Sequence, residues 1–294
     1  MTSCPICGSA AEPSMDATDE NHRVSSQIFS YAKCPQCRTV FLTNPPDDLG
    51  RYYEADYYDI PSLDRLKDLA AKDPNKVEIV DRFSSGKRLL EIGPAFGVFA
   101  FQAKQHGYDV DVIEMDDRCC NYLRDTVRVG VTQSDKPQEA LSELPQHDVI
   151  ALWHVLEHLH AIPAVVEAAA ANLNPGGVLV IATPNPDAAQ FGLMGAHWPH
   201  LDAPRHLALI PMDTLTELGA KHGLEQFFVT TDDSDARSWN RFGWQRLLMN
   251  RVRSRTMQRA MFVLGYGVGV LAAPFDRRSV RGSAYTMVLK KVPA

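Results

Sequence analysis

Four cysteines near the N-terminus have the spacing of a metal site. They form two Cys-x2-Cys turns, Cys4 with Cys7 and Cys34 with Cys37. Each two-residue gap lets both sulfurs of a turn face one point, and two such turns supply the four thiolates of a closed tetrahedral zinc site. Because four protein ligands leave no position for water, we expect a structural zinc ion. Paired disulfides and a redox Cys-x2-Cys motif are the alternatives.

A glycine-containing turn further along the chain has the features of a cofactor site. Residues 89–97 read LLEIGPAFG and lead into a predicted helix, so Gly93 and Gly97 would let a ligand approach backbone N–H groups. Positions 95 and 98 are not glycine, which argues against a G-x-G-x-x-G dinucleotide fingerprint. Glu114 ends the next predicted strand, where a carboxylate can accept ribose hydroxyls. Glu91 would repel a phosphate, so the pattern favours a nucleoside joined to a cationic amino acid.

The elements that must position these residues alternate in type. From residue 87 onward, helical patterns separate short aliphatic runs, which predicts a Rossmann-like α/β fold with a parallel sheet. The predicted strands are 88–92, 110–114, 127–131, 148–153, 178–183, 224–230 and 285–290.

Three regions are predicted from the changes in pattern. The first is a zinc ribbon over 1–45, with strands at 27–32 and 39–42 and a turn-like stretch at 11–21. The second, 46–86, is a linker and helical bridge with a packing cluster of tyrosines at 51–58 and a helix over 63–83. The third is the main domain, 87–294, with a helical insert over 232–281 before the last strand. We expect Cys119 and Cys120 to be buried in a helix as small hydrophobic residues.

These motifs together resemble the class I S-adenosylmethionine-dependent methyltransferases, here with an N-terminal four-cysteine zinc ribbon. The resemblance covers about residues 87–290 and rests on the 91–97 turn, Glu114, the DVIALWHVLEHL stretch of 148–159 and the motifs at 173–177 and 182–185. It implies a seven-stranded sheet whose last strand, 283–290, is antiparallel.

The resemblance also implies S-adenosylmethionine as cofactor and assigns residues to it. Glu91 and the turn of Gly93 and Gly97 would lie near its methionine part, and Glu114 would hold the ribose. Ser134 or Asp135 would meet the adenine amine. The remaining residues that we expect beside the cofactor are Met115, Trp153 and His154.

Methyl transfer to a hydroxyl needs alignment of donor and acceptor and a base that removes a proton. His158, in the Glu-His pair after the fourth strand, is the first candidate base, and Glu157 is its orienting partner. A packing role beneath the cofactor is the alternative for His158. His154 and His158 could bind a metal by their spacing, but a third ligand is not found nearby in the sequence.

The loop 197–207 is dense in histidine, tryptophan, aspartate and arginine, which suggests acceptor binding at the edge of the sheet. Trp198 and Asp202 are candidate acceptor contacts, Arg205 could hold an anionic group, and His206 is the alternative base. The opposing interpretation is a loop braced by internal hydrogen bonds.

The net charge of −6 hides an asymmetry. Residues 236–294 carry 12 basic residues and one acid, or +11, which leaves −17 for the rest. The overall balance argues against a nucleic-acid partner. The basic and apolar stretch 241–275 could be a lid, a homodimer interface or a peripheral membrane contact.

No apolar run is long enough to span a bilayer, and no secretory signal is recognisable. We therefore expect a cytoplasmic protein, with peripheral membrane contact as an option.

The sequence therefore predicts a methyltransferase acting on a hydroxyl of a sugar, a glycan intermediate or a secondary metabolite. The acceptor would be a small molecule, a glycan or a lipid-linked compound. The alternatives are a sugar C-methyltransferase, which the tyrosine cluster and Glu-His pair also resemble, and a non-catalytic adaptor that binds zinc and cofactor.

Overall fold

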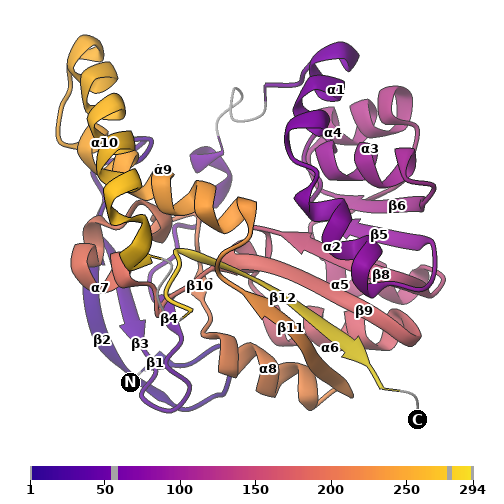
Figure 1. Ribbon diagram of the computed structural model, residues 1–294. Helices are drawn as coiled ribbons and strands as arrows, with labels where there is room; N and C mark the ends of the chain where they lie inside the picture. Colours follow the sequence, from indigo (N-terminus) through magenta and orange to yellow (C-terminus); the bar gives the residue numbers. More distant parts are fainter. Residues whose placement is uncertain (1, 54–58, 277–279, 293–294) are drawn as a thin grey trace.

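The computed structural model describes residues 2–53, 59–276 and 280–292, and two sheets organise them (Figure 1). The larger sheet has seven strands in the order β11-β12-β9-β8-β5-β6-β7. Its strands are β5 (Arg88–Ile92), β6 (Asp109–Glu114), β7 (Gly130–Gln133), β8 (His147–Trp153), β9 (Leu173–Pro184), β11 (Leu224–Thr230) and β12 (Ala284–Lys291).

The direction of β12 distinguishes this sheet from a fully parallel one. β12 runs antiparallel to both of its neighbours, β9 and β11, with Tyr285 opposite Thr183. The strands from β5 to β9 pair in parallel. The predicted seven-stranded α/β sheet with an antiparallel last strand is confirmed.

Helices cover both faces of the sheet, which explains the nearly unbroken apolar sequence of its central strands. One face packs against α1 (Leu63–Lys72), α2 (Asn75–Phe83), α3 (Val98–Gln105), α4 (Asp117–Tyr122) and the π-helical turn Leu123–Val127. The other packs against α5 (Pro137–Glu143), α6 (Ile162–Asn172) and α8 (Met212–Ala220).

Several predicted boundaries differ from those in the structure, and β9 begins at Leu173, five residues before the predicted strand. The helix expected over 63–83 is divided before Asn75, because the residue before Pro74 is disfavoured in helical conformation. The strand expected at 127–131 begins only at Gly130, after Arg128 takes a left-handed conformation with φ 61°. Cys119 and Cys120 are buried in α4, as predicted.

The N-terminal sheet has the order β1-β2-β3-β4-β10. Its strands are β1 (Thr2–Ser3), β2 (Ala10–Ala17), β3 (Phe29–Lys33), β4 (Val40–Leu42) and β10 (Ala208–Leu209). The prediction of a turn-like stretch over 11–21 was wrong for β2, whose side chains are mostly exposed and whose polar sequence therefore hid a strand. β10 comes from the main domain and pairs antiparallel with β4, so the two parts of the chain share this sheet.

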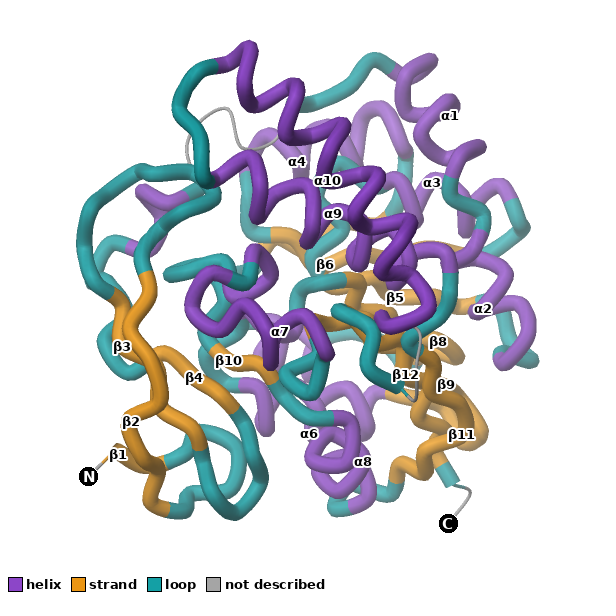
Figure 2. The backbone as a smooth tube through the Cα atoms, turned by 60° about the vertical axis from the view of Figure 1, so that its left-hand side comes forward, coloured by secondary structure: helices purple, strands orange, loops and turns teal. Residues whose placement is uncertain are grey.

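The insert before β12 forms a helical hairpin of α9 (Ser234–Asn250) and α10 (Arg255–Asp276). In Figures 1 and 2, α10 lies on the outside of the molecule beside α9. A Cβ on Gly265 would come within 2.5 Å of the Gln245 Cα, so the two helices approach closely at this glycine. No helix among the described residues has the length and apolarity to cross a bilayer.

The remaining helices are short and lie in loops around the site. They are α7 (Ala189–Met194) and the 3-10 turns η1 (Leu49–Tyr52), η3 (Leu156–His158), η4 (Gly195–His197) and η5 (Pro199–Leu201). The domain boundaries inferred from the sequence stay a prediction.

Candidate active site

The carboxyl ends of β5 and β6 lie side by side and carry two buried acids. Glu91 is buried, and its Oε2 atom has no hydrogen-bond partner among the described residues. Burial raises the pKa of Glu91 to about 8. A buried carboxyl oxygen without a partner is costly unless a ligand completes it, and a cationic group would do so.

The turn after Glu91 has the backbone that a ligand cradle requires. Gly93 and Gly97 have φ values of 68° and 80°. A Cβ on Gly93 would lie 2.7 Å from a methyl group of Val155, and one on Gly97 would lie 2.5 Å from Leu123. Both the conformation and the lack of space therefore require glycine here.

Glu114 organises the neighbouring loop. One of its carboxylate oxygens accepts hydrogen bonds from the backbone N–H groups of Met115 and Asp116, and the other accepts one from Ala95. These three bonds leave one acceptor position on the carboxylate, which offers about four. The side chain of Met115 is exposed, and Ser134 donates its backbone N–H to the Glu114 carbonyl, so both predicted cofactor residues lie at this edge.

Two side chains of α9 contact His154, the residue that follows β8. The His154 Nε2 atom lies 2.6 Å from Asp235, and the imidazole stacks on Trp239 with ring centroids 3.8 Å apart. Burial lowers the pKa of His154, but Asp235 and Glu157 outweigh it and raise the pKa to about 9. His154 is thus a buried imidazolium between two carboxylates. Trp153 packs edge-on against Phe99 inside the sheet's helical layer.

His158 and His206 present two imidazoles to each other. Their ring centroids are 4.7 Å apart and their planes lie at 76°. His158 Nδ1 lies 3.0 Å from the Arg205 carbonyl and 2.9 Å from the Tyr53 hydroxyl, and His206 Nδ1 lies 2.8 Å from the His200 carbonyl. Because a carbonyl can only accept, each Nδ1 carries a proton, and in the neutral ring of His158 the Nε2 atom keeps its lone pair.

Glu157 lies at the centre of this group and is fully buried. Its Oε2 accepts a hydrogen bond from the Thr183 hydroxyl, while its Oε1 has no hydrogen-bond partner among the described residues and lies 3.9 Å from His206 Nε2. Burial raises the pKa of Glu157, but the neighbouring His154 and the other two histidines outweigh it and lower the pKa to about 2. Burial and the nearby His206 lower the pKa of His158 to about 4.

The structure brings together a set of possible metal ligands that differs from the predicted pair of His154 and His158. One ligand atom each from Glu157, His158 and His206 lies within 4.8 Å of the others, a spacing that could also hold a cation. His154 is turned toward Asp235, so the pair His154 and His158 inferred from spacing is not the set that comes together.

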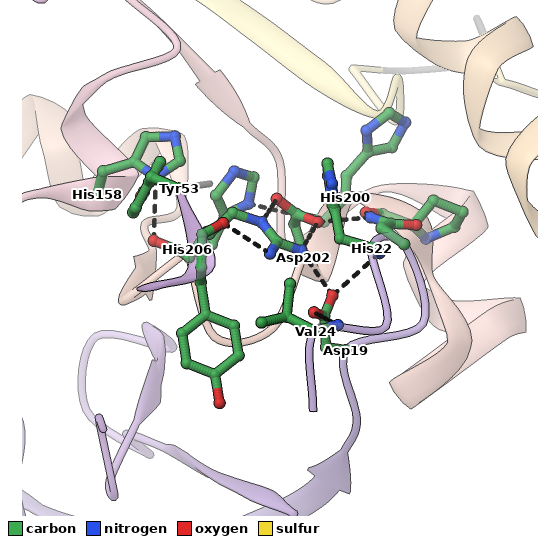
Figure 3. A network of polar contacts seen from close by, with 12 residues as sticks. Asp19, His22, Val24, Tyr53, His158, His200, Asp202 and His206 are labelled. Atoms are coloured by element: carbon green, nitrogen blue, oxygen red, sulfur yellow. Dashed lines mark hydrogen bonds and ion pairs between the residues drawn. The ribbon is translucent and has the colours of Figure 1, made fainter. Parts of the chain in front are cut away.

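Arg205 belongs to a buried ionic network that joins the N-terminal region to this group (Figure 3). This region, residues 1–45, is the predicted zinc ribbon and is called the ribbon below. Its guanidinium is fully buried and contacts Asp19 and Asp202, each at 2.8 Å. Asp19 lies in the β2–β3 loop and also accepts hydrogen bonds from the backbone N–H groups of His22 and Val24. The guanidinium thus pairs with one carboxylate of its own loop and one of the N-terminal region, and the expected role of Arg205 in holding an anionic acceptor stays a prediction.

Trp198 is buried as well. Only about 1% of its surface is exposed, and it packs against Phe191 at a centroid distance of 4.9 Å. Its role as an acceptor contact, like the other site assignments, stays a prediction.

The four N-terminal cysteines come together at the end of the ribbon. The Sγ atoms of Cys4 and Cys37 are 3.5 Å apart, as are those of Cys7 and Cys34. All four sulfurs lie within 4.8 Å of one another. Four thiolates converging in this way are the donor set of a structural zinc ion.

Several residues at the site were missed by sequence reasoning. Asp19 was placed in a turn-like stretch, Tyr53 in a packing cluster, and Asp235 and Trp239 in an insert of unknown contacts. Their signal was weak because each reaches the site from a distant part of the chain. The rest of the tyrosine cluster, 54–58, lies outside the described residues.

Comparison with known proteins decides the family. A family model described as a methyltransferase domain matches residues 64–227, more than half of the chain. The chain belongs to this methyltransferase family. The match includes Glu91, Glu114 and the Glu157–His158 pair, and it ends within β11, before the hairpin.

Individual relatives of this methyltransferase are distant. The "Ubiquinone biosynthesis O-methyltransferase" of Bordetella avium is 27% identical over 143 residues, which cover 45% of this chain and 59% of that protein. The chain thus spans about three fifths of that relative. A SAM-dependent methyltransferase from Archaeoglobus fulgidus superposes with a TM-score of 0.51 at 17% identity, covering 77% of this chain and 94% of that one. Phosphoethanolamine N-methyltransferase 2 of Haemonchus contortus, solved with S-adenosyl-L-methionine, has a TM-score of 0.50 at 15% identity, with coverages of 74% and 52%. These similarities confirm the predicted class I methyltransferase fold.

Proposed function

We propose that the protein transfers a methyl group from S-adenosylmethionine to a hydroxyl of a sugar, a glycan intermediate or a related secondary metabolite. The observation that carries the proposal is the His158 imidazole, whose Nδ1 proton is held by the Arg205 carbonyl so that Nε2 can accept a proton, beside the buried Glu157 with its lowered pKa. The relative named as an O-methyltransferase supports an oxygen acceptor.

The cofactor end of the proposal rests on the Oε2 atom of Glu91, which has no hydrogen-bond partner within the part of the chain that the structure describes. Its buried carboxyl would pair with the ammonium of the cofactor's methionine part, and the glycine turn would offer backbone N–H groups. The free acceptor position of Glu114 would take a ribose hydroxyl. When bound, S-adenosylmethionine supplies an electrophilic methyl group on a sulfonium.

The acceptor end needs a base. His158 Nε2 would take the proton of the acceptor hydroxyl as its oxygen bonds to the methyl carbon and the carbon–sulfur bond breaks, which leaves S-adenosylhomocysteine. The lowered pKa keeps His158 neutral and ready to accept, although it also weakens the base. Glu157 opposes part of this lowering, because its negative charge stabilises the imidazolium that forms. The Arg205 carbonyl and Tyr53 hydroxyl fix the ring.

We also propose that the four cysteines bind one structural zinc ion. The convergence of four sulfurs within 4.8 Å supports this, as does the small size of the sheet they close. With four thiolates the ion has no open position for chemistry.

Two measurements test the methyltransferase proposal. Isothermal titration with S-adenosylmethionine should show one site, and labelled cofactor with fractionated glycan, lipid and small-molecule extracts should yield a product whose methyl group is on oxygen. Binding without transfer to any fraction would favour the adaptor, and a methyl group on carbon would favour the sugar C-methyltransferase.

The base assignment has its own variant. His158→Ala should lower kcat by about 10²- to 10⁴-fold with little change in cofactor affinity. His160→Ala is the matched control, because His160 is exposed and two residues away. Unchanged kcat in His158→Ala would overturn the base. Loss of activity on chelation, restored by a divalent cation with zinc still in the ribbon, would assign the three residues to a metal.

A further inference from the structure

The α9–α10 hairpin exposes more large apolar side chains than a surface helix in contact only with water. On α10, Val263 is 70% exposed and Leu271 is 84% exposed. The other large apolar residues exposed on this helix are Met257, Phe262, Leu264, Tyr266, Val270 and Phe275. Large apolar side chains exposed in such number on one helix are typical of an interaction site.

The charge of the same hairpin has one sign. Residues 236–275 contain seven arginines and neither lysine, aspartate nor glutamate, in a chain whose net charge is −6. Four of them cluster at the turn between the helices and at the start of α10: Arg251, Arg253, Arg255 and Arg259. All four of these side chains are exposed.

Apolar and basic groups meet in one groove at this end of the hairpin. The open groove has a volume of about 490 Å³ and is lined by Met249, Arg255, Gln258, Arg259, Phe262 and Val263. Two guanidinium groups beside three apolar side chains match a molecule with an anionic head and an apolar body.

The hairpin is attached to the rest of the protein through α9. Arg246 donates hydrogen bonds to Asn21 of the β2–β3 loop, and the Asn240 carbonyl accepts one from the side chain of the buried Gln190 in α7. Its first helix also contacts the candidate active site through Asp235 and Trp239. The apolar face of α10 is therefore carried by a hairpin whose other helix is held against the candidate active site.

We propose that the α9–α10 hairpin docks on the surface of an anionic phospholipid bilayer. The arginines at the turn would meet lipid phosphates, and the exposed apolar side chains of α10 would enter the headgroup boundary, which is how basic amphipathic helices bind membranes. A second copy of the chain fits this face less well, because residues 236–275 contain no acid that could pair with the arginines across a symmetric contact. The protein is negative overall, so repulsion from the same surface would orient it with the hairpin toward the membrane.

Vesicle sedimentation tests this proposal. The full chain should bind vesicles of phosphatidylcholine with phosphatidylglycerol, bind neutral phosphatidylcholine vesicles at least tenfold more weakly, and be released by about 0.5 M salt. Arg255→Glu with Arg259→Glu should weaken binding to the anionic vesicles by at least about tenfold. Val263→Asp with Leu271→Asp should weaken it as well, through loss of the apolar contact.

The control double variant is Lys136→Glu with Lys221→Glu, which changes the net charge equally at exposed residues outside the hairpin. It should bind the vesicles nearly as well as the native chain, and all variants should retain cofactor binding as a check of folding. The proposal is overturned if the native chain does not distinguish anionic from neutral vesicles, or if the control weakens binding as much as the hairpin arginines do. It is also overturned if Leu271→Asp dissociates a dimer in solution without affecting vesicle binding.

Discussion

At the scale of single residues, the site is marked by buried carboxyl oxygens that have no hydrogen-bond partner among the described residues. One belongs to Glu91 at the end of β5, and the other belongs to Glu157 between His154 and His206. An unsatisfied buried oxygen costs about 1–3 kcal/mol, so it persists where a ligand recovers that cost. The two glutamates thus mark opposite ends of the proposed reaction, with cofactor at one and acceptor at the other.

Glu91 should make cofactor binding depend on pH. Its raised pKa, about 8, means that the free protein holds this carboxyl protonated at neutral pH, whereas the cofactor's ammonium requires it ionised. Affinity for S-adenosylmethionine should therefore increase as pH rises from 6 to 8, by up to about tenfold per pH unit. Isothermal titration over this range measures the effect.

Glu91→Gln should remove most of that pH dependence and weaken binding at pH 8. Glu139→Gln, at an exposed position of α5, should leave both unchanged. An affinity of the native protein that does not vary between pH 6 and 8 would contradict the assignment.

At the scale of elements, loops from three parts of the chain meet around Arg205. Its side chain pairs with Asp19 of the ribbon and Asp202 of its own loop, and its carbonyl holds the Nδ1 proton of His158. Asp19 therefore acts on the proposed base only through Arg205, as a positioning residue. The ribbon is part of the site's support even though it contributes no group to the reaction.

Asp19→Ala should destabilise the protein by about 3–5 kcal/mol, because it leaves a buried guanidinium without one of its partners. It should also lower kcat more than it changes cofactor affinity. Asp187→Ala breaks the exposed pair with Arg38 and should cost less than about 1 kcal/mol. Urea unfolding of the two variants compares their free energies of unfolding. Equal losses would show that the buried pair stabilises the protein no more than the exposed pair.

Elements were more predictable from the sequence than the contacts between them. The strands of the larger sheet follow from short aliphatic runs, because their buried positions leave little choice of residue. β2 was missed since its side chains are mostly exposed, and β10 because two residues carry no periodic signal. The motifs at Glu91, Glu114 and Glu157 are local in sequence and could be found. The Asp19–Arg205 and Asp235–His154 pairs join residues far apart in the chain, and composition does not reveal such pairs.

At the scale of the whole molecule, the ribbon and the methyltransferase sheet are packed as one body. Cys4, Cys34 and Phe41 lie in the same hydrophobic cluster as residues of β8, α6 and α8. Phe29 and Tyr31, on the other side of the ribbon, pack in a second cluster with Trp198. A substitution of one of the four cysteines should therefore disturb the packing of the loop that carries His206.

Removal of the proposed zinc should show this. The native chain should contain about one zinc per molecule by elemental analysis, and Cys34→Ala should lose it, unfold at lower urea and lose methyl-transfer activity. Cys119→Ala, at a buried cysteine of α4 outside the cluster, should keep the metal. A Cys34→Ala protein with full zinc content would refute the four-cysteine site.

The pairing of β4 with β10 also sets an order of events during synthesis. Phe41 aligns with Ala208, so the last strand of the N-terminal sheet is supplied by a segment made long after the first four. The ribosome must release the chain past residue 209 before that sheet can close, although its cysteines emerge early. The cysteines can then bind metal before the sheet is complete. Until β10 has been synthesised, the β4 edge of the N-terminal sheet stays unpaired.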